Sequence, residues 1–441
     1  MPAMANSVID PTRQLQRALY RAAKQSATRR FHALYDKVHR WDVLKRAWQN
    51  VKANGGTAGV DGETLAAIEQ QGVDKALREL QTQLQAGRYR PQPVRRVYIP
   101  KPGKAAKRGL GIPSVRDRIV QAAAKIVMEP IFEADFTDSS YGFRPKRSAH
   151  DAAEHIRRAA NQGNNWVVDA DIRAYFDTID QAKLLTMVAR RISDRRMLKL
   201  VRGWLRAGVM EEGNLRMAIA GTPQGGVISP LLANIYLHRL DQLWQQHHRQ
   251  LGELVRYADD LVILCPTAQA AAKALLVLTQ ILAALGLQVH PEKTHIRCLR
   301  RGQEGFDFLG FHFHKQASQR RKGYHFLQRW PSPKAMKAIR QKVKALTQPR
   351  YLLSWPVQDV VQALNSTLQG WAAYFRKGNS AQKFSQIDNH VVGRLRLFLS
   401  AKHQRRGRQR KRWSLTYLYQ DLGLYRLAGT VQWYTSAKAH G

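Results

Sequence analysis

Cysteine and long apolar runs are scarce in this chain. Its two cysteines, Cys265 and Cys298, are too few for a disulfide framework or for a zinc module built from several cysteines. The most apolar run, residues 275–285, contains two polar residues and is too short to span a bilayer, so it predicts a buried helix. The N-terminus lacks the apolar core of a signal peptide. We therefore expect a protein of a reducing cytoplasm with no membrane partner.

Acidic residues are also few. The chain has 72 Lys and Arg against 32 Asp and Glu, which gives a formal net charge of +40. A field of this sign predicts a polyanionic partner. The basic residues run through the whole chain, which favours nucleic acid over the membrane surface that a single basic amphipathic helix would indicate. With 441 residues and 44% hydrophobic content, the chain must also bury a large core, which excludes a simple basic tail.

The most informative segment is VRYADDLVIL, at residues 255–264. Apolar, strand-forming residues flank its central YADD on both sides, which predicts a β-hairpin with Asp259 and Asp260 at the tip. Two carboxylates on a tight turn repel each other, so a cation is expected to offset that cost. Hard oxygen ligands of this kind suit paired Mg²⁺ ions. A solvated Asp-Asp turn is the alternative interpretation.

A second carboxylate segment, WVVDADIRAYFDTID, occupies residues 166–180. Its first residues alternate as in a strand, with Asp169 and Asp171 on the same face, so either one can join the later pair once the chain folds. Between the two segments, residues 221–241 predict a glycine-rich turn followed by a helix with an apolar stripe. The pattern thus indicates two strands whose carboxylates meet.

Taken together, these segments resemble the palm of a reverse transcriptase, and more narrowly of a bacterial group II intron-encoded reverse transcriptase/maturase. The resemblance covers nearly the whole chain in the family's order. It implies an α+β right-hand polymerase: fingers and palm with a central antiparallel sheet, then an α-helical thumb/maturase domain and a short basic C-terminal region. The further matching segments are GTAGVDGETL (56–65), VYIPKPGKAAKRGLGIPSVRDRIVQAA (97–123), SYGFRPKRSAHDA (140–152), PQGG (223–226), LGLQVHPEKTHI (285–296), FDFLGFHF (306–313) and LNSTLQGWAAYFRKG (364–378).

Four regions are expected along the chain. The first is an N-terminal extension that binds RNA, the second the fingers and palm, the third the helical thumb/maturase domain and the fourth a basic segment that binds DNA or RNA. Their predicted bounds are residues 1–90, 91–325, 326–400 and 401–441.

Apolar residues at three- and four-residue spacing predict individual helices. One is expected over residues 31–51, and two more helical faces lie within residues 357–375 and 387–398. Many relatives also carry a C-terminal nuclease domain of the His-Asn-His type, supported by cysteine pairs that bind a metal. Because no cysteine follows Cys298, we expect that domain to be absent.

By resemblance, Asp171, Asp259 and Asp260 are the catalytic residues and hold two Mg²⁺ ions, with Ile172 as a further metal contact. The aspartate followed by Ile and then by a Tyr-Phe pair is the family's ligand, which selects Asp171 over Asp169. Two metals about 3.5–4 Å apart activate the attacking 3′-oxygen and stabilise the leaving pyrophosphate.

Five residues match nucleotide-binding positions of the family. Phe176 is expected to exclude a 2′-hydroxyl by steric clash and so to select dNTPs; the alternative is an ordinary core phenylalanine. Lys101 and Arg108, on the two arms of a predicted hairpin, are expected to hold the triphosphate. Gln224 is expected to pack against the sugar. Lys293 resembles a lysine that protonates the leaving pyrophosphate, and the alternative is a solvated surface lysine.

The basic C-terminal half is expected to bind phosphates without sequence preference. Aromatic residues among the charges, Trp371, Tyr374 and Trp413, favour a nucleic-acid surface over a solvated charge run, since rings stack on bases. The candidate cations are Arg376, Lys377, Arg405, Arg406, Arg408, Arg410, Lys411 and Arg412.

The resemblance implies an RNA-directed DNA polymerase that binds its group II intron RNA, assists its splicing and reverse-transcribes it during retrohoming. Its other partners would be dNTPs, a DNA primer and target DNA, and it would work as a nucleoid-associated ribonucleoprotein in the bacterial cytoplasm. Three alternatives stay open. A maturase with a decayed polymerase would have lost the aspartates. A reverse transcriptase recruited for phage defence or spacer acquisition would not be expected to keep the maturase-like thumb. An RNA-dependent RNA polymerase would carry glycine before the aspartate pair and no aromatic residue at 176.

Overall fold

The computed structural model describes residues 10–100, 107–211, 214–216, 221, 225–319 and 321–432. Helices and three sheets confirm the expected α+β class. The chain packs as two discontinuous units, Met1–Ser148 with Val168–His295 and Ala149–Val167 with Ile296–Gly441. This division into two units does not test the bounds of the four regions expected from the sequence, which stay predictions. Within the described ranges, no helix is both long and apolar enough to cross a membrane.

Helices at the start of the first unit pack around α6 (Val115–Glu133), which is buried along most of its length. The predicted helix over residues 31–51 is wrong at its start. Phe31 forms an isolated β-bridge with Ile192, and the longer helix begins only at Trp41. The spacing of apolar residues typical of a helix includes Phe31, but the pairing of Phe31 with a distant residue keeps it out of the helix. The other helices are α1 (Pro11–Gln25), α2 (Tyr35–Val38), α3 (Trp41–Asn54), α4 (Leu65–Gln71) and α5 (Val73–Gln85).

One sheet of the first unit has the strand order β2-β1-β4-β5. Strands β1 (Val94–Pro100) and β2 (Lys107–Ile112) form the antiparallel hairpin expected for the fingers. Arg108 lies in β2 opposite Ile99, while Lys101 lies outside the described residues. The two short strands are β4 (Val209–Glu211) and β5 (Asn214–Arg216).

The sheet that carries the aspartates has the order β6-β7-β3-β8. As expected, β6 (Glu253–Tyr257) and β7 (Asp260–Cys265) form an antiparallel hairpin. Helix α12 (Ala268–Ala284) packs on β7, whose residues after Asp260 are all buried. The remaining elements are β3 (Trp166–Asp171), α8 (Tyr175–Thr178), α9 (Gln181–Ala189), α10 (Arg195–Arg206), α11 (Ser229–Leu243) and β8 (His295–Cys298).

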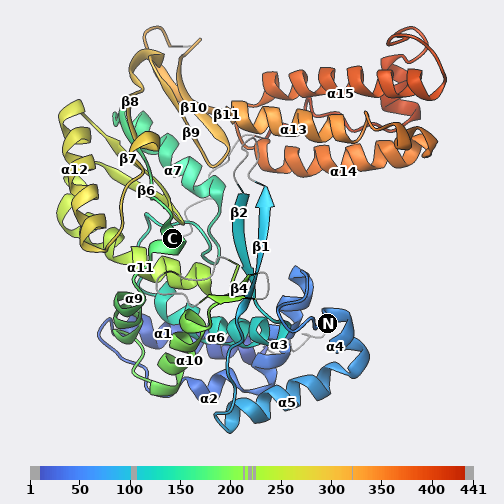
Figure 1. Ribbon diagram of the computed structural model, residues 1–441. Coiled ribbons are helices and arrows are strands. Elements are labelled where there is room, and N and C mark those ends of the chain that lie inside the picture. Colours follow the sequence, from blue (N-terminus) through green and yellow to red (C-terminus); the bar gives the residue numbers. More distant parts are fainter. Residues whose placement is uncertain are drawn as a thin grey trace, which may run out of the picture. The chain divides into compact units, whose positions relative to one another are not determined.

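The second unit combines a three-stranded antiparallel sheet with a helical bundle. Its sheet order is β11-β10-β9, and helix α7 (Ala149–Asn161) packs on β11. In the bundle, α13 contacts both α14 and α15, and the three helices lie side by side in Figure 1. The predicted apolar faces are buried, as at Leu364 and Leu395. The bounds are β9 (Gly305–Phe308), β10 (Phe311–Ala317), β11 (His325–Pro331), α13 (Pro333–Ala345), α14 (Val357–Phe375) and α15 (Ala381–Lys402).

Residues 413–432 pack onto this bundle. Asp388 of α15 accepts hydrogen bonds from the backbone nitrogens of Leu427 and Ala428, at 2.9 and 2.8 Å. Trp413 is only 5% exposed, and its ring lies 5.5 Å from that of Tyr417. The prediction that the Trp413 ring stacks on nucleic-acid bases is therefore wrong, because the ring belongs to the core.

Candidate active site

The two adjacent aspartates lie where β6 turns into β7. Tyr257 pairs with Asp260, so Ala258 and Asp259 form a two-residue turn. Such turns require positive φ angles, and Ala258 has a φ of 58°. That left-handed conformation costs a residue with a Cβ about 1–2 kcal/mol. Ala258 is buried, Asp259 is half-buried and Asp260 is exposed. The surroundings therefore hold a strained turn in which Asp260 is open to solvent and Asp259 is partly covered.

Asp171 ends β3, the strand beside β7. Its backbone is fixed by the segment that follows α12, because the His290 nitrogen donates a 2.7 Å hydrogen bond to the Asp171 carbonyl. Its carboxylate forms an ion pair with the Lys293 ammonium. The exposed fractions of the two side chains are 29% for Asp171 and 49% for Lys293. Ile172 is buried and its side chain is apolar, so only its backbone carbonyl is suited to contact a metal.

The segment after Asp171 connects β3 to the turn electrostatically. Tyr175 is buried, and its hydroxyl donates a 2.6 Å hydrogen bond to the Ala233 carbonyl. Burial raises the pKa of Tyr175 well above its usual value; the Arg256 guanidinium opposes this rise and the Asp259 carboxylate adds to it. Tyr175 thus lies near the YADD turn, and the position of β3 beside β7 brings the two carboxylate segments of the sequence into one region.

Phe176 is half-buried, with its ring 5.3 Å from the Tyr175 ring. Gly221 packs directly against it, since a Cβ on Gly221 would lie 2.6 Å from the Phe176 carbonyl oxygen. Gly221 opens the segment that contains Gln224, which lies outside the described residues. The two other aspartates of this region differ in role: Asp180 caps α9, whereas Asp177 is exposed within α8.

The donor chemistry of this region fits a hard divalent cation. Carboxylate oxygens are the ligands Mg²⁺ prefers, and the ammonium on Asp171 marks where a positive charge is favourable. Across the described part of the chain, however, no three His, Cys, Asp or Glu side chains are gathered closely enough to hold a metal. The fold brings Asp259 and Asp260 together in one turn and holds Asp171 on the adjacent strand.

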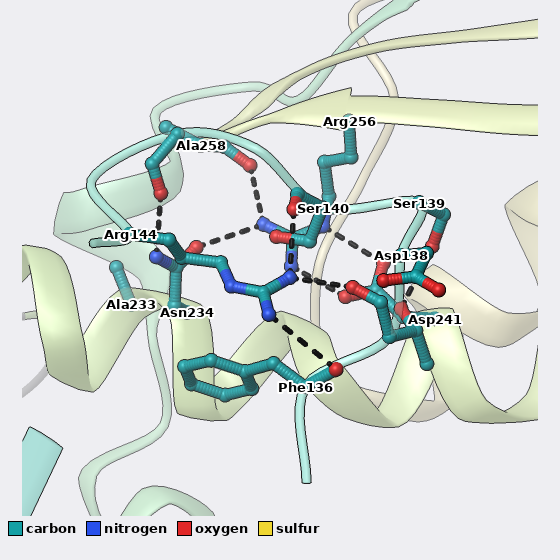
Figure 2. Close-up of polar contacts among 12 residues, drawn as sticks. Phe136, Asp138, Ser139, Ser140, Arg144, Ala233, Asn234, Asp241, Arg256 and Ala258 are labelled. Atoms are coloured by element: carbon teal, nitrogen blue, oxygen red, sulfur yellow. Dashed lines mark hydrogen bonds and ion pairs between the residues drawn. The ribbon is translucent and has the colours of Figure 1, made fainter. Parts of the chain in front are cut away.

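Sequence patterns do not reveal a buried ionic network behind the turn (Figure 2). Arg256 of β6 and Asp241 of α11 form an ion pair in which both side chains are fully buried. The same guanidinium donates hydrogen bonds to Asn234 and to the Ala258 carbonyl, at 3.0 and 2.8 Å. Two features of the sequence could have indicated this network. One is an arginine next to the apolar residues of a strand, and the other is the presence of Asn234 and Asp241 on an apolar helix face.

The C-terminal candidate cations fall into two groups. Arg376 and Lys377 follow α14 and are half-buried, and the Lys377 carbonyl accepts a 3.1 Å hydrogen bond from the Arg329 side chain. The others lie in the loop after α15 and are exposed to solvent. These exposed residues are Arg405, Arg406, Arg408, Arg410, Lys411 and Arg412.

Two family models match the chain in succession. Residues 99–313 match the reverse transcriptase (RNA-dependent DNA polymerase) model, and residues 336–417 match the group II intron, maturase-specific domain. The second match extends through α13, α14, α15 and the basic loop that follows them. The region built around the YADD turn is thus a reverse transcriptase domain.

Curated relatives agree with this assignment. The group II intron-encoded protein LtrA of Lactococcus lactis subsp. cremoris is 38% identical over 53% of this chain and 38% of its own length. Protein YkfC of Escherichia coli (strain K12) is 39% identical over 55% of this chain and 64% of its own length. An uncharacterized 91 kDa protein in the cob intron of Schizosaccharomyces pombe is 29% identical over 80% of this chain and 51% of its own length. The chain thus spans less than two thirds of each relative.

The chain belongs to the group II intron-encoded reverse transcriptase/maturase family. A reverse transcriptase domain directly followed by the maturase-specific domain carries this assignment. It confirms the family expected from the sequence.

Proposed function

We propose that this protein is an RNA-directed DNA polymerase that binds its group II intron RNA, assists its splicing and reverse-transcribes it during retrohoming. The observation that carries this proposal is the pairing of an intact YADD turn, next to the strand that ends at Asp171, with a maturase-specific domain in the same chain. A maturase whose polymerase has decayed would be free to lose Asp171, Asp259 and Asp260, and this chain retains all of them.

Two Mg²⁺ ions held by Asp171, Asp259 and Asp260 would activate the primer 3′-hydroxyl and stabilise the charge on the leaving pyrophosphate. Lys293 holds a proton at its Nζ beside Asp171. A divalent cation would compete with the Lys293 ammonium for that carboxylate. We infer that the released Lys293 then acts as the general acid toward pyrophosphate.

The nucleotide pocket is proposed on the same basis. Lys101, together with Arg108 of β2, would bind the triphosphate: the lysine as a point charge and the arginine through its planar guanidinium. Phe176 would exclude the 2′-hydroxyl, and Gln224 would pack against the sugar. The close approach of Gly221 to the Phe176 backbone supports this proposal, because Gly221 opens the segment that contains Gln224.

RNA binding is proposed for the second unit. Its maturase-specific domain ends in the exposed basic loop of residues 405–412, whose cations would neutralise phosphates and release counterions. Intron RNA, target DNA and a DNA primer are the polyanions that the proposed reaction requires.

Primer extension tests the proposal. The wild-type protein should extend a DNA primer on an RNA template in the presence of Mg²⁺. The Asp259→Ala and Asp171→Ala variants should lose extension while keeping RNA affinity in a filter-binding assay. Asp74→Ala removes an aspartate that is 62% exposed in the same unit and serves as the matched control. Near-normal extension by either active-site variant would contradict the assignment.

A further inference from the structure

Arg256 and Asp241 form an ion pair that no solvent reaches. Removing two charges from water carries a large cost, and well-packed apolar side chains of similar volume often serve stability as well or better. Strand β6 offers such packing, because its neighbours Leu254 and Val255 are buried and apolar. Stability alone therefore gives little reason for a charged pair at this point.

The hydrogen bonds of Arg256 show where its charge is directed. Its Nε and Nη2 donate to the two carboxylate oxygens of Asp241, at 2.8 and 2.5 Å. Its Nη1 donates to the Asn234 side-chain oxygen at 3.0 Å and to the Ala258 carbonyl at 2.8 Å. Asp241 and Asn234 orient the guanidinium from α11, and the remaining donor is aimed at the turn. The only backbone carbonyl among these acceptors belongs to the residue with the left-handed conformation, Ala258.

The opposite side of the turn is held by residues 139–144. The Arg256 nitrogen donates to the Ser139 carbonyl at 2.8 Å, and the Tyr141 nitrogen donates to the Arg256 carbonyl at 2.9 Å. Gly142 lies so close that an added Cβ would be 2.9 Å from the Tyr257 carbonyl carbon. The Gly142 carbonyl accepts a 2.8 Å hydrogen bond from Asn234, the same residue that binds Arg256.

Arg144 fixes this second segment in turn (Figure 2). Its guanidinium donates to the carbonyls of Thr137, Ser140 and Phe136, at 2.5, 2.7 and 3.4 Å, and pairs with Glu133 at 2.7 Å. The backbone of the YADD turn is therefore clamped between a rigid loop and the Arg256 guanidinium.

We propose that Arg256, held by Asp241 and Asn234, is a positioning residue that fixes the Ala258–Asp259 turn and so sets the affinity of the YADD carboxylates for divalent metal. This inference rests on the proposed function for its metal. The Arg256 guanidinium also attracts the Asp259 carboxylate, which adds to its hold on the turn. The guanidinium itself stays charged at every working pH.

The double substitution Arg256→Met with Asp241→Leu tests the proposal, because it removes both buried charges together and leaves neither unpaired. The matched control is Arg191→Met with Asp135→Leu. That pair joins a buried arginine to an aspartate at 3.1 Å in the same unit, and Arg191 also binds backbone carbonyls. Arg256→Lys keeps the positive charge but loses the planar guanidinium that bonds Asp241, Asn234 and Ala258 together.

Three measurements are made on each full-length protein: Mn²⁺ binding by electron paramagnetic resonance, hydrogen exchange of the amides of residues 258–261 without metal, and the Mg²⁺ dependence of primer extension. The Arg256–Asp241 double variant should bind Mn²⁺ roughly 10–100-fold more weakly, as is typical when the groups that support metal ligands are removed. Its turn amides should exchange faster, and its half-saturating Mg²⁺ concentration should rise to a similar degree. Arg256→Lys should fall between this variant and the wild type.

The control should match the wild type in Mn²⁺ affinity and in exchange at residues 258–261. Wild-type Mn²⁺ affinity and exchange in the Arg256–Asp241 variant would overturn the proposal, and so would an equal loss of Mn²⁺ affinity in the control. If the wild-type protein extends no primer, the proposed function fails, whereas Mn²⁺ binding and metal-free exchange still decide the role of Arg256.

Discussion

A single added methyl group at Gly142 should displace the YADD turn, which we propose carries two of the catalytic carboxylates. Gly142 has an ordinary backbone conformation, so alanine is acceptable there on dihedral grounds. The new Cβ, however, would lie 2.9 Å from the Tyr257 carbonyl carbon and closer still to the Ala258 nitrogen. Ordinary carbon contacts start at about 3.5 Å, so the turn must move by about 0.6 Å or more.

Gly142→Ala should lower the rate of catalysis much more than it lowers the stability of the fold. Overpacking typically costs about 1–3 kcal/mol of folding free energy, which a unit of this size can tolerate. A misplacement approaching 1 Å in an active site can lower the rate about 10²-fold. We therefore expect Gly142→Ala to fold, to bind RNA normally and to lose roughly 10–100-fold in the rate of single-nucleotide addition.

Single-turnover primer extension measures this rate, with thermal unfolding and filter binding measured in parallel. Gly370→Ala is the control, since it adds the same methyl group on α14 where no atom other than the neighbouring backbone of that helix lies within 4 Å. Wild-type addition by a folded Gly142→Ala protein would refute the argument, because it would mean that the turn absorbs the methyl without moving its carboxylates.

Three further predictions concern other parts of the molecule. Phe176→Ala should raise the ratio of ribonucleotide to deoxyribonucleotide incorporation in competition assays, and an unchanged ratio would make Phe176 a core residue only. Burial lowers the pKa of His238 to about 4, so the folded protein resists a proton that the unfolded chain takes up near pH 6.5. Stability should consequently fall as the pH drops from 6.5 to 4, by up to about 3 kcal/mol from this residue. Urea unfolding at several pH values should show a shallower fall for His238→Phe, and an identical fall would contradict this. Finally, exchanging the basic loop for glutamine should reduce the slope of log K against log salt by about 0.7–0.9 for each phosphate that the loop no longer neutralises, and an unchanged slope would show that the loop does not bind RNA. The exchanged residues are Arg405, Arg406, Arg408, Arg410, Lys411 and Arg412.

The sequence predicts the elements that local patterns can determine. Apolar residues on both sides of YADD predict its hairpin, and Tyr257 does pair with Asp260. The spacing of apolar residues predicts the buried faces of α14 and α15, and Leu364 and Leu395 are buried as that spacing requires. In each case the residues that form the sequence pattern are neighbours along the chain, and the same residues form the structure that the pattern predicts.

The features that the sequence does not predict have long-range causes. Phe31 continues the apolar period of the following helix, yet it pairs with Ile192, far away in the sequence. Trp413 lies beside a basic block that favours a surface ring, but the chain after it folds back onto Asp388 of α15. The sequence does not single out Arg256, because a charge within a strand usually points to solvent. Its acceptors on α11 and in the turn become visible only once the chain is folded.

Two cations lie next to the carboxylates that we propose as the metal ligands. Arg256 lies behind the YADD turn with no solvent access, where Asp241 holds its guanidinium in place. An arginine keeps its charge at every working pH. Lys293 pairs with Asp171 from the solvent side, and both of these side chains are partly exposed. Exposed pairs are worth only about 0–1 kcal/mol, so a divalent cation would displace Lys293 at little cost, whereas the fully buried Arg256 is out of its reach. We therefore expect the two cations to have separate roles: the buried one would set the geometry of the turn, and the exposed one would neutralise Asp171 until a metal binds.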